Sequence, residues 1–172
     1  MAAIRRFQPV LRNAAPRLAT TTVQPTKRFL NWSSDPAIWT ANATATGGRQ
    51  GKVEAPTLKA ELGMPKAAGG DGKKTNPEEL FAAGYGACFV GAMGATAPTL
   101  GLKLPDGVTA NTDVHLIGDL KKLDIGIRVD MTIKAPGMKK EDLDKLVEKT
   151  KTVCPYSRAT EGNVITNLKT EV

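Results

Sequence analysis

The middle of the chain carries its most pronounced hydrophobic pattern. From Leu80 to Leu102 no residue is charged, and apolar or small residues occur on every side of a helical projection. Asn76 suits an N-cap and Pro77 the first helical position, and the two glutamates that follow suit the positive end of a helix dipole. The pattern predicts a helix that begins after Asn76, ends near Pro98 and is buried on all sides.

This uncharged run is also long enough to cross a bilayer. Much of it is Gly, Ala and Thr, Pro98 interrupts its end, and the flanking sequence has the patterns of a globular domain. A buried core helix is therefore the favoured interpretation, with no stable membrane insertion.

Alternating apolar and polar residues predict strands on both sides of this helix. Val108–Ile117 and Ile125–Ile133 have the period of two expected of half-buried antiparallel strands. Earlier in the chain, Ala37–Thr46 and Lys52–Leu62 read as the strands of a hairpin around the glycine-rich turn Gly47–Gly51.

A second helix, amphipathic this time, is predicted over Lys139–Val153, with Pro155 ending it. Its apolar positions recur at helical spacing: Leu143, Leu146, Val147, Thr150, Val153 and Cys154. A last strand follows over Asn163–Val172. The order of elements predicts an α+β fold, in which a mostly antiparallel sheet packs with a central buried helix and a second, amphipathic helix.

The positive charge of the chain is concentrated at its start. Of the formal net charge of +7, most comes from residues 1–34, which hold six Arg or Lys and no Asp or Glu. This composition is typical of a mitochondrial transit peptide, with a disordered basic tail as the alternative. We therefore expect a leader over 1–34, a single domain over 35–172 and a mitochondrial matrix location. The charge is poor evidence for nucleic-acid binding by the folded part.

Two cysteines and one histidine limit the chemistry that the chain can support. Cys88 lies in the uncharged helix and Cys154 on the apolar face of the second, while His115 is the only histidine. They are too few for a disulfide framework or for a usual zinc site, so no metal is expected. The two thiols either meet as a redox pair or are inert core residues.

A reactive cysteine needs a nearby positive charge to stabilise its thiolate. Cys88 lies too far along its helix for the dipole to supply that charge, so a side chain must. Arg49 is the first candidate because glycines flank it. The rival cations are Arg128 and Arg158, and the carboxylates able to pair with a buried arginine are Glu78 and Glu79.

Three segments carry a more specific signal: NPEELFAAGYGACF, the GGR turn and VCPYSRATEGN. Together they resemble the organic hydroperoxide resistance family, a branch of the superfamily that includes osmotically inducible protein C. The resemblance runs from about Trp39 to the C-terminus. It implies a thiol peroxidase for alkyl or lipid hydroperoxides, an intertwined α+β homodimer, no bound cofactor, and dihydrolipoamide or a lipoylated protein as reductant. The basic leader departs from the bacterial pattern and fits an organellar version.

The resemblance also implies roles for four residues. Cys88 corresponds to the peroxidatic cysteine, which forms a sulfenic acid, and Cys154 to the resolving cysteine, which condenses with it to a disulfide. Arg49 corresponds to the catalytic arginine and Glu78 to the glutamate that orients it, whereas Glu79 occupies a variable position. Apolar side chains near Cys88 would favour organic substrates, or would simply pack the core: Phe81, Phe89 and Met93.

The spacing within the central helix has a geometric consequence. Glu78 and Cys88 are ten residues apart, or about 15 Å along a straight helix. We therefore expect a site at a dimer interface, with Glu78 of one chain near Cys88 of the other, unless the helix bends or begins late. Small residues at three- to four-residue spacing would allow close helix–helix approach: Gly84, Ala87, Gly91 and Ala95.

Two other functions use the same scaffold. The chain could be a non-enzymatic module that responds to redox state or binds an apolar ligand, or it could be an organellar copy that has lost activity. Retention of all four matched residues argues against the second.

Overall fold

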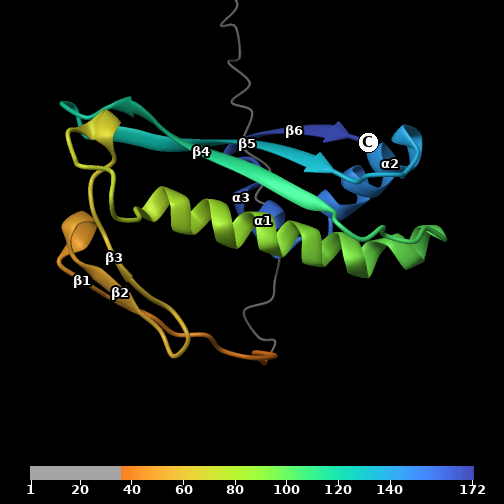
Figure 1. The fold of residues 1–172 in the computed structure, drawn as a ribbon, viewed down its shortest axis with the longest axis horizontal. Helices are drawn as coiled ribbons and strands as arrows, with labels where there is room; N and C mark the ends of the chain where they lie inside the picture. Colours follow the sequence, from red (N-terminus) through yellow and green to blue (C-terminus); the bar gives the residue numbers. More distant parts are fainter. Residues whose placement is uncertain (1–35) are drawn as a thin grey trace, which may run out of the picture. The chain divides into compact units, whose positions relative to one another are not determined.

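The computed structural model describes residues 36–172, and its elements follow the predicted order of strands, helix, strands, helix and strand (Figure 1). The leader predicted over 1–34 lies outside the described residues. Residues 41–172 pack together as one unit. The predicted α+β fold is confirmed.

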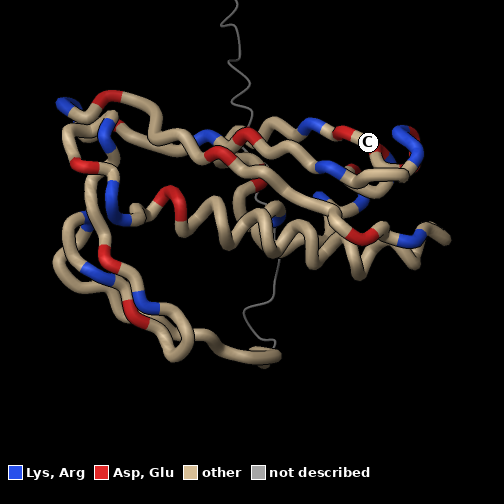
Figure 2. The backbone as a smooth tube through the Cα atoms, in the orientation of Figure 1, with Lys and Arg blue, Asp and Glu red and all other residues tan. Residues whose placement is uncertain are grey.

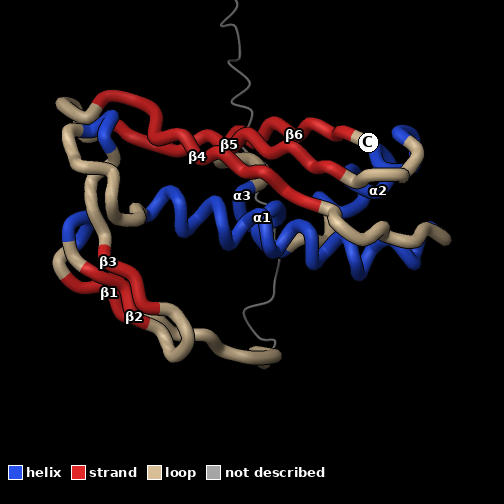
Figure 3. The backbone as a smooth tube through the Cα atoms, viewed as in Figure 1, coloured by secondary structure: helices blue, strands red, loops and turns tan. Residues whose placement is uncertain are grey.

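Two three-stranded sheets are present in the described chain (Figure 3). The first is antiparallel and joins β1 (Thr44–Thr46), β2 (Lys52–Glu54) and β3 (Lys59–Glu61). The second has the order β4-β5-β6, with β4 (Thr109–Asp119), β5 (Asp124–Lys134) and β6 (Ile165–Glu171). Strand β4 runs antiparallel to β5, whereas β6 runs parallel to it.

The first sheet differs from the predicted hairpin of two long strands. Only the end of Ala37–Thr46 forms a strand, and Lys52–Leu62 divides into β2 and β3. The division falls at Pro56, which has no backbone N–H to continue a ladder. Around it the backbone turns, with Ala55 and Leu58 each accepting a hydrogen bond from the other's N–H.

The central helix α1 (Pro77–Thr96) begins as the sequence predicts. The Asn76 side chain accepts a hydrogen bond from the Glu79 N–H at 2.9 Å, and Pro77 occupies the first helical position. At its other end the helix gives way to the 3-10 turn η3 (Ala97–Leu100), close to the predicted stop at Pro98. Figure 2 shows that α1 carries charged residues only in its first turn.

One face of α1 lies against β4 of the second sheet and against both later helices. The buried side chains on this face include Tyr85, Phe89 and Met93. The prediction of burial on all sides is wrong for the single chain, because the opposite face is exposed. The exposed positions on that face are small: Ala83, Ala87, Gly91, Gly94 and Ala95. By length and composition Pro77–Leu100 could also cross a membrane, a weak criterion that core helices of soluble proteins meet as well.

Helix α2 (Lys140–Lys151) packs against α1 and β6 and buries four of the predicted apolar positions: Leu143, Leu146, Val147 and Thr150. Val153 is 40% exposed because α2 ends before it and the helical period no longer applies. Pro155 does not simply stop a helix. It opens a further short helix, α3 (Pro155–Thr160), in which its missing N–H costs nothing at the first position.

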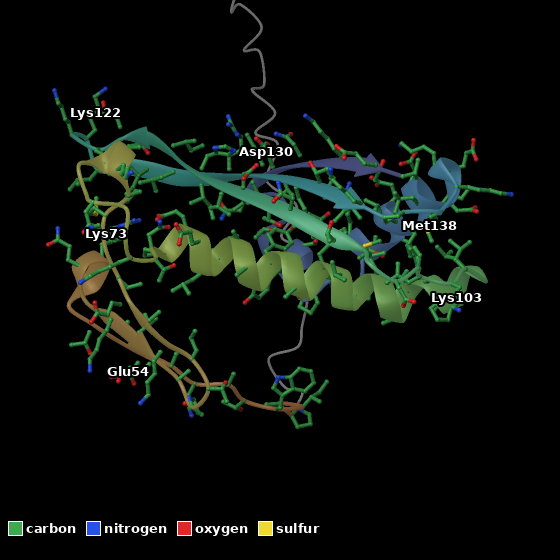
Figure 4. The ribbon with its side chains drawn as sticks, viewed as in Figure 1. Glu54, Lys73, Lys103, Lys122, Asp130 and Met138 are labelled. Atoms are coloured by element: carbon green, nitrogen blue, oxygen red, sulfur yellow. The ribbon has the colours of Figure 1, made fainter. Side chains whose placement is uncertain are left out.

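The outer face of the second sheet is polar, as the alternation predicts. Val129 and Met131 point into the core and are buried, whereas Asp130 between them lies on the face away from α1 (Figure 4). There Asp130 accepts hydrogen bonds from Asn167 at 2.6 Å and contacts His115 at 3.0 Å. The histidine is thus part of a surface network on this sheet.

The core can be tested at Leu146, which is fully buried in the cluster formed by α1, α2 and β5. Leu146→Ala should lower the free energy of unfolding by about 2–5 kcal/mol, because it removes buried methyl groups and leaves a cavity. Urea denaturation at fixed protein concentration measures this change. Leu123→Ala is the control, because Leu123 is 84% exposed. A cost at position 123 equal to that at position 146 would contradict this core.

Candidate active site

The two cysteines meet in the folded chain. Both are free thiols, and the Cys154 Sγ lies 3.6 Å from the Cys88 Sγ. A disulfide bond has a length of about 2.05 Å, so the sulfurs need to approach by only about 1.5 Å to form one. Cys154 is fully buried, whereas Cys88 is half-buried. The arrangement can therefore support a reversible disulfide.

Cys154 occupies the short junction between α2 and α3. Its N–H donates to the Thr150 carbonyl at 2.8 Å, and its own carbonyl accepts from the Arg158 N–H at 3.0 Å. These two bonds tie the residue to the last turn of one helix and the first turn of the next. The junction turns the chain just after the apolar face of α2, which places the thiol against Cys88 on α1.

The environment of Cys88 disfavours its ionised form in the single chain. Burial raises the pKa of the Cys88 thiol, the neighbouring Cys154 thiol raises that pKa further, and a hydrogen bond from the Tyr156 backbone N–H lowers it. The net direction is upward. A reaction through the thiolate therefore requires additional positive charge at this sulfur.

Arg49 and Glu78 form the second half of the candidate site. The guanidinium donates two hydrogen bonds to the carboxylate, with Nη1 2.9 Å from Oε2 and Nη2 2.6 Å from Oε1. This bidentate bond lowers the pKa of Glu78 and raises that of Arg49. Arg49 lies in the 3-10 turn η1 (Gly48–Gln50), where Gly47 and Gly48 both have positive φ.

The competing residues have other contacts. The rival cation Arg128 lies on β5, 3.9 Å from Asp130. The Glu79 carboxylate accepts hydrogen bonds from Thr75 Oγ1 at 2.7 Å and Asn76 Nδ2 at 3.0 Å, so it caps the start of α1. Of the two glutamates, Glu78 is the one that pairs with Arg49.

One residue of each half of the site lies on the same continuous helix, α1. Glu78 is in the first turn of α1 and Cys88 ten residues later, so they are about 15 Å apart along the axis. A late helix start is ruled out, because α1 begins at Pro77 and runs unbroken to Thr96. The single chain brings each pair together but not the two pairs, and the interface alternative stays a prediction.

The three apolar candidates near Cys88 divide into two kinds. Phe89 and Met93 are fully buried in the core, as the core-packing alternative requires. Phe81 is partly buried and stacks on Tyr156, with ring centroids 6.0 Å apart and planes at 14°. Tyr156 was not among the sequence candidates, although its position two residues after Cys154 was a usable signal.

A cavity of about 680 Å³ lies beside the Arg49–Glu78 pair. Its wall combines this ion pair with apolar side chains from the loop after β3 and the tip of the β4–β5 hairpin, among them Met64, Leu116 and Ile125. Within the described residues, no cluster of three or more His, Cys, Asp or Glu is arranged to hold a metal ion.

Known proteins resemble this chain in sequence and in fold. Residues 70–169 match the family of OsmC-like proteins. The chain belongs to the OsmC-like family. This OsmC-like chain is 49% identical over 137 residues to the organic hydroperoxide resistance protein of Xanthomonas axonopodis pv. citri, a match that covers 77% of this chain and 94% of that protein. It is 41% identical over 137 residues to the organic hydroperoxide resistance protein OhrA of Bacillus subtilis, covering 77% and 95%.

The fold comparison gives the same result for the OsmC-like chain. The crystal structure of an organic hydroperoxide resistance protein from Legionella pneumophila superposes with a TM-score of 0.73 at 39% identity, covering 80% of this chain and all of that one. The family expected from the sequence motifs is confirmed. The roles of the four site residues stay predictions.

The Arg49–Glu78 pair should make the stability of the chain depend on pH. Because the folded-state pKa of Glu78 is lowered, its contribution to stability is present above the unfolded pKa of about 4.3 and is lost as the pH falls through the folded pKa. Glu78→Gln should therefore cost about 1 kcal/mol at pH 7, after allowance for solvent screening of Arg49, and almost nothing near pH 2. Urea denaturation across this range measures the difference.

Glu61→Gln is the matched control. Glu61 also pairs with a cation, Lys74 at 3.0 Å, but its side chain is 73% exposed. Its replacement should change stability by less than about 0.5 kcal/mol at either pH. A Glu78→Gln cost that did not shrink with falling pH would contradict the assignment.

Proposed function

We propose that this chain is a cysteine-based peroxidase that reduces organic hydroperoxides to alcohols. The observation that carries the proposal is the pair of free thiols 3.6 Å apart, on a chain 49% identical to an organic hydroperoxide resistance protein. One thiol is half-buried and within reach of a substrate, and the other is fully buried behind it. This is the arrangement that a peroxidatic and a resolving cysteine need.

The chemistry proceeds in three steps. The Cys88 thiolate attacks the distal oxygen of the hydroperoxide, the O–O bond breaks, and the alkoxide takes up a proton and leaves as the alcohol. The Cys154 sulfur then attacks the Cys88 sulfenic acid, the S–O bond breaks, and water leaves as the disulfide forms. An external dithiol reduces the disulfide by exchange and is itself oxidised.

Arg49 and Glu78 supply the missing charge in a homodimer. We infer that the ion pair of one chain lies beside the partner's Cys88, where the guanidinium lowers the thiol pKa and donates hydrogen bonds to the peroxide. Two features support this: Glu78 and Cys88 lie ten residues, or about 15 Å, apart along α1, and the exposed face of α1 is lined with small residues that allow close helix packing. Glu78 holds the guanidinium in orientation through its bidentate bond.

The proposal for the reductant rests on the family resemblance, and the proposal for the location rests on the composition of the leader. We propose dihydrolipoamide or a lipoylated protein as the electron donor, with no cofactor bound to the chain itself. The acid-free basic leader supports a mitochondrial matrix location, where lipoylated dehydrogenase complexes occur.

Replacing each cysteine should separate the steps. Cys88→Ser should abolish turnover of an alkyl hydroperoxide, because the attacking sulfur is lost. Cys154→Ser should still consume about one equivalent of hydroperoxide per chain and then stop with dihydrolipoamide, because no disulfide forms. Hydroperoxide consumption measures both variants. Full activity in Cys88→Ser would refute the assignment.

The choice of dithiol separates the enzyme from a non-enzymatic redox module on the same scaffold. The wild-type chain should turn over many times with dihydrolipoamide and poorly with thioredoxin. Stoichiometric oxidation without turnover by either dithiol would favour the redox module.

A mixing experiment tests whether the site is shared between chains. Cys88→Ser and Arg49→Ala homodimers should both be inactive or nearly so. After unfolding and refolding together, half the dimers are mixed, and each mixed dimer has one site with both native residues. The mixture should recover about a quarter of wild-type activity. The control is a refolded mixture of the Cys88→Ser and Cys154→Ser variants. Because both cysteines of a site come from one chain, no mixed dimer has a site with both native cysteines, and the mixture should stay inactive. Activity that stayed at the level of the separate variants would place the whole site within one chain.

A further inference from the structure

A buried hydrogen bond joins the helix of Cys88 to the helix that follows Cys154. The Tyr85 hydroxyl donates to Ser157 Oγ at 3.0 Å, and both side chains are buried. Tyr85 lies three residues before Cys88 on α1, and Ser157 three residues after Cys154 on α3. The bond therefore spans the two helices one turn away from each sulfur.

The position of α3 depends on contacts of this kind. The helix has six residues and no side-chain cap at its start, and helices this short are not stable by themselves. Its buried residues are Ser157, whose hydroxyl accepts from Tyr85, and Thr160, whose Oγ1 donates to the Tyr156 carbonyl at 2.9 Å and lies 3.5 Å from the tyrosine hydroxyl. Since a buried hydroxyl is costly without a partner, Tyr85 favours the docked position of α3.

An aromatic contact reinforces the same docking. The Tyr156 ring stacks on Phe81 and meets the Tyr85 ring edge-on, with centroids 5.9 Å apart. It lies over Gly84, where an added Cβ would be only 3.1 Å from the tyrosine ring. The docked α3 also directs the Tyr156 N–H at the Cys88 sulfur. The start of this small helix thus presents two groups to Cys88: the resolving thiol, which α2 also holds, and a hydrogen-bond donor.

We propose that Tyr85 and Ser157 are positioning residues for disulfide formation, a proposal that rests on the peroxidase function above. Their hydrogen bond holds α3 on α1 and thereby keeps Cys154 close to the Cys88 sulfenic acid. In this step the S–S bond forms, the S–O bond breaks, and the hydroxyl leaves as water with the thiol proton. The sulfurs start 3.6 Å apart, so with α3 docked a small shift completes the bond.

Two variants remove the bond with little change of shape, Tyr85→Phe and Ser157→Ala. Each should slow disulfide formation about three- to tenfold, the factor that corresponds to one buried hydrogen bond, while oxidation of Cys88 changes less than about twofold. Rapid-mixing measurements with one equivalent of hydroperoxide give both rates. Trapping of the Cys88 sulfenic acid by dimedone should rise in both variants.

Three comparisons distinguish positioning from a general loss of stability. Ser157→Thr keeps the hydroxyl and should restore the rate. The double variant should be no slower than either single variant, because both remove the same bond. Thr96→Val is the matched control: it removes a buried hydrogen bond to the Ala92 carbonyl within α1, eight residues beyond Cys88. Thr96→Val should leave the rate of disulfide formation unchanged. An equal slowing in Thr96→Val, or no slowing in Tyr85→Phe and Ser157→Ala, would overturn the proposal.

A measurement without hydroperoxide separates this proposal from the peroxidase function. In buffers of oxidised and reduced dithiothreitol, the equilibrium constant for the Cys88–Cys154 disulfide should fall by the same three- to tenfold factor in Tyr85→Phe and Ser157→Ala. If the wild-type chain did not react with hydroperoxides but the two variants showed this shift, the peroxidase function would be refuted and the positioning role kept. If the wild-type chain were an active peroxidase and the equilibrium constant were unchanged in the variants, the positioning role would be refuted and the peroxidase function kept.

Discussion

The rigidity of α1 constrains everything else about the site. A helix that runs unbroken from Pro77 to Thr96 fixes the separation of any two residues on it, and so fixes about 15 Å between Glu78 and Cys88. Rotation of the Glu78 and Cys88 side chains does not close that distance. The single chain therefore presents two candidate half-sites, one built on an ion pair and one on two thiols. The two residues of each half-site are in contact within the chain.

The electrostatics of the half-sites are complementary. Burial raises the pKa of Cys88 and favours its neutral thiol, while Glu78 holds the cationic guanidinium of Arg49 in place beside an open cavity. A neutral thiol would react more slowly with oxidants, since the thiolate is the reactive form. Joining the halves in a dimer would couple assembly to activation. In the proposed dimer, the exposed small residues of α1 would serve as the contact surface that brings the two halves together.

Patterns that depend on local physics were predictable from the sequence. The Asn76 cap, the paired strands β4 and β5 and the apolar face of α2 all follow from capping chemistry and periodicity. The residues alone left Glu78 and Glu79 open as partners of Arg49, and only the resemblance to a family chose Glu78, because no periodicity relates a turn to a helix 29 residues later. The helix α3 was missed because Pro155 was read as a stop, although proline suits the first helical position equally well. The parallel pairing of β6 was likewise not predictable from alternation, which is the same in both kinds of sheet.

The complete burial of Cys154 gives the regeneration of the proposed enzyme a direction. Of the two cysteines, Cys88 is partly exposed and Cys154 is fully buried. An incoming dithiol would therefore form its mixed disulfide on Cys88, with Cys154 as the leaving group that withdraws into the core. The reductant would attack the same sulfur that reacts with peroxide. Substrate and reductant would therefore compete for access to Cys88 and could not be bound there together.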